Sequence, residues 1–392
     1  MSNKTIDILK LLCYNVKFSI AGDFWFEPNE SLAYRIVQYI CFILYFVVFA
    51  LEFMEFIYYD YPTDLHNDAV SFVMGRALVL SRALIMIYYK CEARILCENI
   101  IKVLRNYEEE SVIKMQYKKI KYAIVIQNLI TYAGMLSYIL EGIRRAYSDG
   151  IPFFAIVTYY PRYEDNSSLA LLMRISIIII HCYFILIMVN CDCLAIGYII
   201  IMYSKFITLR RYFDNLSEQY TLKSKVMNSE EMRLWFKEKC LEGLIVHREL
   251  IRLSGVIRKI FGAVISIQVC EGSFVTIQLM LRLSVGIHLL ITMNLLFAVY
   301  VMYTVALFTW NVGELTYQAS LMYTAIFHCG WYNLEMETNH KDVRRMILIG
   351  CVQAQKPIVI KAFGLRIISY ETFVAVSIFI VIFTVCDQNI NC

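Results

Sequence analysis

Residues 169–203 read LALLMRISIIIIHCYFILIMVNCDCLAIGYIIIMY, an apolar run whose only charged residues are Arg174 and Asp192. A helix that crosses a bilayer needs roughly 20 mostly apolar residues. This run therefore predicts a transmembrane helix that tilts or extends beyond the bilayer. Six further apolar stretches are long enough to cross, and the seven predicted spans are 36–58, 69–89, 122–143, 169–203, 261–281, 286–312 and 358–386. The sequence predicts an all-α membrane protein, with residues 1–392 as a single seven-helix domain.

The composition supports this fold class. The chain is 59% hydrophobic and 18% charged, against about 45–50% and about 25% in soluble domains. Residues 1–17 mix charged and apolar positions and have no cleavage site of the secretory type, so the first span is expected to insert uncleaved. The net charge of +4 is spread between the spans, and we expect no nucleic-acid partner.

Lys and Arg residues lie mainly on one side of the predicted spans. That side holds four before the first span, eight in 90–121, twelve in 205–259 and five in 341–361, which gives 29, and the other side holds 4. Because basic residues stay in the cytoplasm, the N-terminus is predicted inside and the C-terminus outside. Asn166-Ser167-Ser168 then forms a glycosylation sequon in an outer loop, although the inner segments also contain sequons, at Asn3, Asn29 and Asn215.

Two segments outside the spans have helical spacing of apolar residues. They are 204–260 and 338–355, and Pro357 ends the second before the last span. Both are predicted to be amphipathic cytoplasmic helices that need a partner for their apolar faces. The partner is either the protein's own helix ends or another subunit in an anchor of several chains.

No sequence motif of an enzyme or a cofactor site is present. The thirteen cysteines show no paired zinc spacing, and Cys191 and Cys193 with His181 are better explained as packing residues than as a metal site. We therefore expect no enzymatic activity, no cofactor and no metal.

Ionisable residues inside the spans are costly and call for a partner or a function. Arg76, Arg82, Arg174, Asp192 and Glu271 are among them. One interpretation is an internal ion pair, for instance between Arg76 or Arg174 and Glu141 or Glu271. The other is direct contact with a ligand.

Aromatic residues and methionines are frequent in the predicted outer halves of spans two to six. Such residues form ordinary cores, and they also line pockets for small apolar molecules. Because the ends of the spans fix membrane depth, one set of positions shares the same outer layer. The candidate ligand-binding residues are Phe72, Val73, Tyr132, Met135, Tyr138, Met173, Ile177, His181 and His288, within spans one to six at 36–312.

The last quarter of the chain carries a series of motifs in a characteristic order. They are Ser320, Ala325, Trp331-Tyr332, Arg344-Arg345, Gln355-x-Pro357, Ser369-Tyr370-Glu371-Thr372-Phe373 and Phe383-Thr384. This order resembles the insect odorant receptor family over roughly 315–386, and the number and orientation of the spans agree. The family usually continues as Ser-Tyr-Ser-Tyr-Phe-Thr-Leu-Leu, whereas this chain reads SIFIVIFT over 377–384.

The resemblance implies an odorant-gated, non-selective cation channel in which four subunits surround a central pore. It implies a small volatile ligand, a shared co-receptor subunit as partner in a heterotetramer, and a multi-pass location in the plasma membrane of olfactory sensory neurons. The co-receptor has a much longer loop between spans four and five, so this chain resembles the odorant-binding subunit.

The resemblance also assigns roles to particular segments. Residues 204–260 and 338–355 would form the cytoplasmic anchor, with a subunit interface at Trp331, Tyr332, Arg344 and Arg345. The span 358–386 would line the pore, and its outer end would carry the gate at Val385, Cys386, Asp387 and Gln388.

Three other classes of protein fit this pattern less well. A gustatory-type chemoreceptor channel is the nearest alternative, but the Thr-Tyr…Gln-Phe tail of that family is missing. A G-protein-coupled receptor would face the other way and would carry Asp-Arg-Tyr and Asn-Pro-x-x-Tyr motifs, which are also missing. A transporter would show internal repeats and broken helices at the middle of the membrane, and this sequence shows neither.

Overall fold

The fold is described from a computed structural model of the whole chain. The residues described are 4–27, 29–58, 63–148, 150–162, 164–284, 291–333, 341–362, 366–368, 370–371 and 374. Within them the secondary structure is almost entirely helical, as the sequence predicts. The elements, in chain order, are α1 Lys4–Phe18, α2 Leu32–Tyr58, α3 Thr63–Tyr88, α4 Lys90–Lys102, α5 Glu110–Ser148, α6 Ser168–Lys223, α7 Ser229–Ser284, α8 Ile291–Ser320, α9 Met322–Phe327, the 3-10 helix η2 Trp331–Asn333, α10 Lys341–Ala354, β1 Lys361–Ala362 and β2 Arg366–Ile367.

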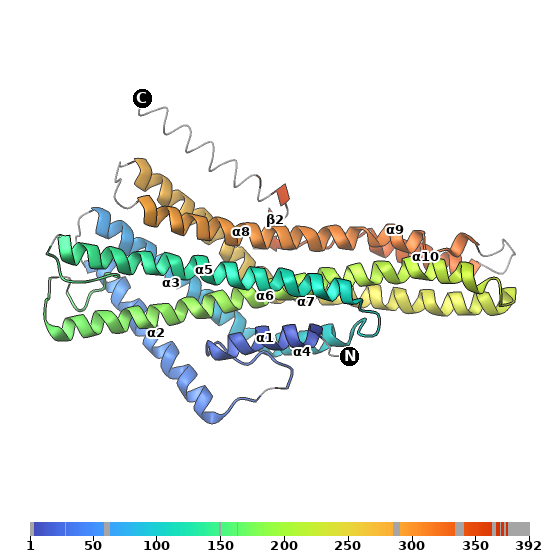
Figure 1. The fold of residues 1–392 in the computed structure, drawn as a ribbon, viewed down its shortest axis with the longest axis horizontal. Helices are drawn as coiled ribbons and strands as arrows, with labels where there is room; N and C mark the ends of the chain where they lie inside the picture. Colours follow the sequence, from blue (N-terminus) through green and yellow to red (C-terminus); the bar gives the residue numbers. More distant parts are fainter. Residues whose placement is uncertain are drawn as a thin grey trace.

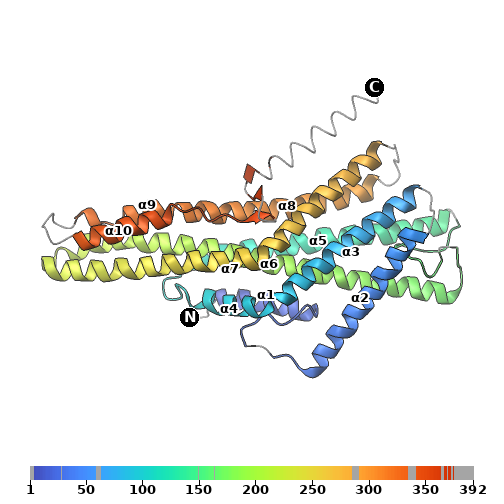
Figure 2. The same cartoon turned by 180° about the vertical axis from the view of Figure 1, so that it is seen from behind.

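The helices form an elongated bundle around α6 (Figures 1 and 2). Helix α6 contacts α1, α3, α5, α7 and α8, and the residues from 187 to 209 are buried along all of its faces. At one end of the bundle α2, α5 and α7 end and α3, α6 and α8 begin (Figure 1). The helices α9 and α10 lie beside α6 and α7 at the other end (Figure 1). The ends of α2, α5 and α7, which are predicted to face outside, therefore lie at the opposite end of the molecule from α10, which is predicted to be cytoplasmic (Figure 1).

The segment 204–260 does not form separate helices. Instead, α6 extends into this segment from one side and α7 begins within it, and each helix is 56 residues long. At 1.5 Å per residue such a helix is about 84 Å long, far more than the roughly 30 Å of a hydrocarbon core. The two helices meet at a tight turn after Lys223, where the side chain of Asn228 accepts a hydrogen bond of 2.8 Å from the backbone N–H of Glu231. This contact caps the start of α7.

A close approach between α1 and α6 depends on Gly197. A Cβ atom at this position would lie 2.3 Å from Cδ1 of Leu12, so any larger residue forces α1 to shift or Leu12 to change rotamer. Leu12 is 1% exposed and belongs to the apolar face that α1 buries against the bundle. The short N-terminal helix is therefore an integral part of the core.

Within the described ranges, three helices are long and apolar enough to cross a membrane when judged by length and composition alone. They are α2, α5 and α6, and the bent pair formed by α3 and α4, with an angle of 64° between its two parts, would be a fourth. Two more of the predicted spans lie on α7 and α8. Most of the predicted span 358–386 lies outside the described residues.

The first residues of that predicted span are not helical. Lys361 and Ala362 pair with Ile367 and Arg366 in a small antiparallel hairpin, and the backbone N–H of Ile368 donates to the carbonyl of Ile360 at 2.9 Å. The prediction of a helix starting at 358 was wrong here because hydropathy averaged over a long stretch hides two local charges. Lys361 and Ile367 are exposed whereas Ile360 and Ile368 are buried, an arrangement that suits a short extended segment.

Candidate functional site

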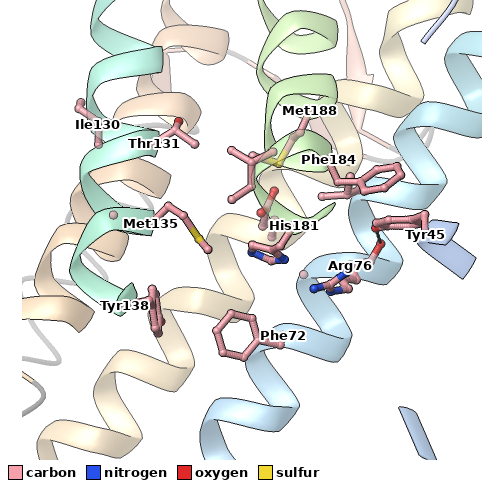
Figure 3. A pocket seen from close by; sticks show the side chains of 15 residues that line it. Tyr45, Phe72, Arg76, Ile130, Thr131, Met135, Tyr138, His181, Phe184 and Met188 are labelled. Carbon is pink, nitrogen blue, oxygen red and sulfur yellow. Dashed lines mark hydrogen bonds between the residues drawn. The ribbon is translucent and has the colours of Figure 1, made fainter. Parts of the chain in front are cut away.

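A cavity of about 110 Å³ lies between α3, α5 and α6, toward the end of the bundle that carries the α2–α3 connection. Most of its wall is apolar, and Figure 3 shows its side chains converging from three helices. The lining residues are Tyr45, Phe72, Gly75, Arg76, Val79, Ile130, Thr131, Gly134, Met135, Tyr138, His181, Phe184, Ile185, Met188 and Glu271. An apolar cavity of about 150 Å³ binds benzene, and this cavity, which is somewhat smaller, has the scale of a molecule with about one ring.

Helical periodicity explains which residues line the wall. The lining positions on α3 are 72, 75, 76 and 79, and those on α6 are 181, 184, 185 and 188. Both sets follow the spacing i, i+3, i+4, i+7, which places side chains on one face of a helix. The two faces, with a third on α5 from Ile130 to Tyr138, are directed toward one another.

Four of the predicted ligand-binding residues meet at this cavity. They are Phe72, Met135, Tyr138 and His181. The ring of Phe72 makes edge contacts with the other two rings, at centroid distances of 5.3 Å to Tyr138 and 5.7 Å to His181. Phe72 therefore joins the α5 and α6 sides of the wall (Figure 3).

The remaining predicted residues do not line the cavity. Val73 is buried but is not part of the wall, and Ile177 packs with Val48 and Ile156 in a small cluster behind the cavity residue Met135. Tyr132 is 39% exposed on the outside of α5, and Met173 is half-buried. His288 lies outside the described residues. Tyr132 and Val73 have the right depth but the wrong helical phase, because neighbouring residues on a helix point about 100° apart.

Sequence reasoning missed two features of the wall. Gly75 and Gly134 face the cavity with no atom within 4 Å of a Cβ built on either, so the missing side chains add to the open space. Tyr45 from α2 and Glu271 from α7 also line the cavity, although neither was among the predicted ligand-binding residues. The signal in the sequence was a glycine three residues from the predicted Phe72 and another four residues from the predicted Tyr138.

The ion pairs inside the spans differ from those proposed from the sequence. Arg76 pairs with Glu52 on α2 rather than with Glu141 or Glu271. Glu141 instead pairs with Arg144 and Arg145, its neighbours three and four residues along the same helix. Arg174 was the other arginine named as a candidate for such a pair. Its guanidinium donates to the carbonyl of Arg162 at 2.7 Å, in the segment that precedes α6.

A buried charged network lies on the side of the cavity toward the middle of the bundle. Arg82 on α3 pairs with Glu271 on α7 and lies 3.1 Å from Oδ2 of Asp192 on α6. Gln127 on α5 donates to Asp192 at 3.4 Å. All four side chains are at most 4% exposed, so the network connects four helices in a region of low dielectric. Glu271 belongs both to the network and to the cavity wall.

At the far end of the bundle, a groove of about 340 Å³ lies between α7 and α10. Its wall includes Leu241, Ile245, Arg345 and Ile349. Ile245 and Ile349 are half-exposed, so the described part of the chain covers the apolar faces of these two segments only in part.

The predicted interface residues lie around this region without forming one patch. The indole N–H of Trp331 donates to the carbonyl of Phe327 at 2.8 Å, and part of the ring packs on the core. Tyr332 is 53% exposed. Arg344 and Arg345 are exposed on α10, and only Arg345 lines the groove.

The other predicted sites have different outcomes. Asn166 is exposed in the segment before α6, and the hydroxyl of Ser167 caps that helix by accepting from the N–H of Ala170 at 3.2 Å. The gate residues Val385, Cys386, Asp387 and Gln388 lie outside the described residues. Within the described ranges, no three His, Cys, Asp or Glu side chains are arranged to hold a metal ion.

The almost entirely helical membrane fold and the mostly apolar cavity inside its bundle together define a membrane protein with a candidate binding site for a small apolar molecule. Residues 64–381 match the family model described as 7tm Odorant receptor. This match covers most of the chain, which therefore belongs to the odorant receptor family.

Solved structures of one insect receptor have the same fold. The insect olfactory receptor OR5 from Machilis hrabei superposes with a TM-score of 0.77 at 13% sequence identity, covering 96% of each chain. The structure of that receptor in complex with eugenol gives a TM-score of 0.76 at 11% identity and covers 97% of each chain. A comparison with curated protein sequences yields no match.

Proposed function

We propose that this chain is the odorant-binding subunit of an odorant-gated, non-selective cation channel. The observation that carries the proposal is the mostly apolar cavity between α3, α5 and α6 in a member of the odorant receptor family. A small volatile molecule would bind there by burying its apolar surface, which contributes about 25 cal/mol per Å². Phe72, Met135, Tyr138 and His181 would contact it directly.

The orientation that fits this role is N-terminus inside and C-terminus outside. Support comes from the excess of Lys and Arg in the segments at the α9–α10 end of the bundle. The cavity then lies in the outer half of the membrane, where a volatile ligand arrives. The protein would act in the plasma membrane of olfactory sensory neurons.

The cation channel would be a heterotetramer with a co-receptor subunit. The half-exposed apolar residues of α7 and α10 around the 340 Å³ groove would face a neighbouring subunit, with Trp331, Tyr332, Arg344 and Arg345 close by. The predicted last span would line the pore, and Val385, Cys386, Asp387 and Gln388 would form its outer gate.

The test is current recording from cells that express this chain with a co-receptor, with the co-receptor alone as the control. The proposal expects ligand-evoked cation currents that require this chain, and a changed ligand rank order in Phe72→Ala or Met135→Ala. The matched variant is Tyr132→Ala, at similar depth on α5 but on its exposed side, which should leave the rank order unchanged. Equal effects of the three substitutions on rank order would contradict this assignment of the binding site.

A further inference from the structure

The cavity wall contains a buried cation with unoccupied hydrogen-bond donors. Arg76 is 2% exposed and lines the cavity. Its Nε faces Glu52 in an ion pair, and its Cζ lies 5.9 Å from the centre of the Tyr45 ring. Its Nη1 and Nη2 atoms have no hydrogen-bond partner among the described residues. Figure 3 shows this guanidinium on the same side of the cavity as the His181 ring.

Three other polar groups of the wall already have partners. The hydroxyl of Thr131 donates to the carbonyl of Gln127 at 2.6 Å, and the hydroxyl of Tyr45 donates to the carbonyl of Arg76 at 2.6 Å. Glu271 is paired with Arg82. A buried donor without an acceptor costs about 1–3 kcal/mol, so the two Nη atoms favour any occupant that brings an acceptor.

We propose that Arg76 is the polar anchor of the cavity and that it selects neutral ligands carrying a hydrogen-bond-accepting oxygen, such as an aldehyde, ketone or ester. The inference rests on the proposed function and adds the chemical class of the ligand. The apolar wall would bind the hydrocarbon part, while the Nη donors would bind the oxygen. A charge-assisted hydrogen bond of this kind is stronger and more directional than a neutral one.

The charges around the cavity favour a ligand oxygen that is neutral. Two guanidinium groups, those of Arg76 and Arg82, lie near four carboxyl groups, which are named at the end of this paragraph. Glu52 already faces Arg76, and Glu55, one turn further along α2, is 1% exposed and without a hydrogen-bond partner among the described residues. A ligand carboxylate would add another anion to this low-dielectric site, which disfavours it. The four carboxyl groups are Glu52, Glu55, Asp192 and Glu271.

The size of the cavity limits the ligands to about one ring or a short chain. Suitable probes are sets of equal shape that differ at one position: toluene, benzaldehyde and benzoate, and the linear set hexane, hexanal and hexanoate. Each is applied to cells that express the receptor with a co-receptor, and half-maximal concentrations are compared within one receptor variant. Such ratios do not depend on how much of that variant reaches the surface.

For the wild-type receptor, each aldehyde should act at a concentration at least about tenfold below that of its hydrocarbon, as expected for a hydrogen bond to a charged group. The acid anion should be weaker than the aldehyde. The double variant Glu52→Gln/Arg76→Met removes both members of the ion pair together, so that neither is left without the other, and should bring the aldehyde-to-hydrocarbon ratio close to one. Arg76→Lys keeps a cationic donor and should keep part of the preference.

The matched control is Val79→Ala, one turn from Arg76 on the same lining face. It enlarges the cavity without touching a donor, so it should shift the aldehyde and the hydrocarbon alike. An unchanged ratio in the double variant, or wild-type responses to hydrocarbons equal to those to aldehydes, would overturn the inference and leave the proposed function standing. A surface-expressed receptor that responds to no compound in either set would count against the proposed function, and the inference would fall with it.

Discussion

Two parts of α6 are packed differently. Between Cys193 and Phe206 the helix is buried on every side, and most of these residues are 0–1% exposed. Only two turns earlier, His181, Ile185 and Met188 face an open cavity. Filled packing is worth several kcal/mol per large side chain, so the cavity end gives up stability that the middle of the helix retains. The difference separates the part of the bundle that holds the fold from the part that can accept a ligand.

The largest expected effect is at the charged network that lies between these two parts. Arg82→Met leaves Asp192 and Glu271 buried without their cation, and breaking a buried pair from one side costs about 3–5 kcal/mol. We expect loss of the folded receptor, measured as the fraction that elutes as a single species from detergent. The triple variant Arg82→Met/Asp192→Asn/Glu271→Gln, which has no unpaired charge, should recover most of it. An Arg82→Met receptor as stable as wild type would show that the network adds nothing to the fold.

The next prediction compares an aromatic residue from each part. Phe206 is 0% exposed in the closely packed middle of α6, and Phe72 is half-buried at the cavity. Phe206→Ala should cost about 3–5 kcal/mol, whereas Phe72→Ala should cost less because its site is already partly open. The melting temperature of the detergent-solubilised receptor measures both. The comparison fails if Phe72→Ala lowers the melting temperature as much as Phe206→Ala does.

A smaller effect is expected at the predicted subunit interface. Large aromatics at such contacts often cost about 2 kcal/mol or more when truncated, so Trp331→Ala or Tyr332→Ala should reduce co-purification with the co-receptor. Because the Trp331 ring also packs on its own subunit, the exposed Tyr332 is the cleaner test. The exposed Tyr147, on α5 near the opposite end of the bundle, supplies the control Tyr147→Ala. Unchanged co-purification of Tyr332→Ala would place the contact elsewhere.

The sequence predicts the helices much better than it predicts their neighbours. Long apolar runs identified the helices because a bilayer imposes length and hydropathy. They did not show that α6 continues to Lys223, since a helix needs no apolar residues to continue once it leaves the bilayer. The hairpin at Lys361 was missed for the converse reason, as two charges in a long apolar stretch hardly change its average.

For the candidate site, the sequence predicts the depth of each residue in the membrane but not the direction in which its side chain points from the helix. The ends of the spans placed Phe72, Tyr132 and His181 in one layer, yet Tyr132 points away from the cavity. Ion-pair partners were unpredictable in the same way. The sequence indicates that Arg76 needs an acid, but only the packing of α2 against α3 selects Glu52.

The smallest predicted effect is a pH dependence at the end of the bundle away from the cavity. His247 on α7 is 2% exposed, and burial lowers its pKa from the ordinary 6.5 to about 4. Its Nδ1 atom has no hydrogen-bond partner in the described part of the chain. Between these two pH values the unfolded chain binds a proton at this histidine and the folded chain does not. The stability from the neutral ring is therefore complete above about pH 6.5 and is lost as the pH falls toward 4.

At pH 5.5 this loss amounts to about 1.4 kcal/mol, one unit below the ordinary pKa. The melting temperature of wild-type receptor should therefore fall between pH 7.5 and pH 5.5 by more than that of His247→Leu, which stays neutral at both. His328→Gln, at an exposed histidine near the same end, is the matched control and should fall as much as wild type. Equal decreases in wild type and His247→Leu would mean that His247 is solvated in the folded receptor. The end of the bundle away from the cavity would then be less tightly packed than the middle of α6, and the contrast along the molecule would be confined to that helix.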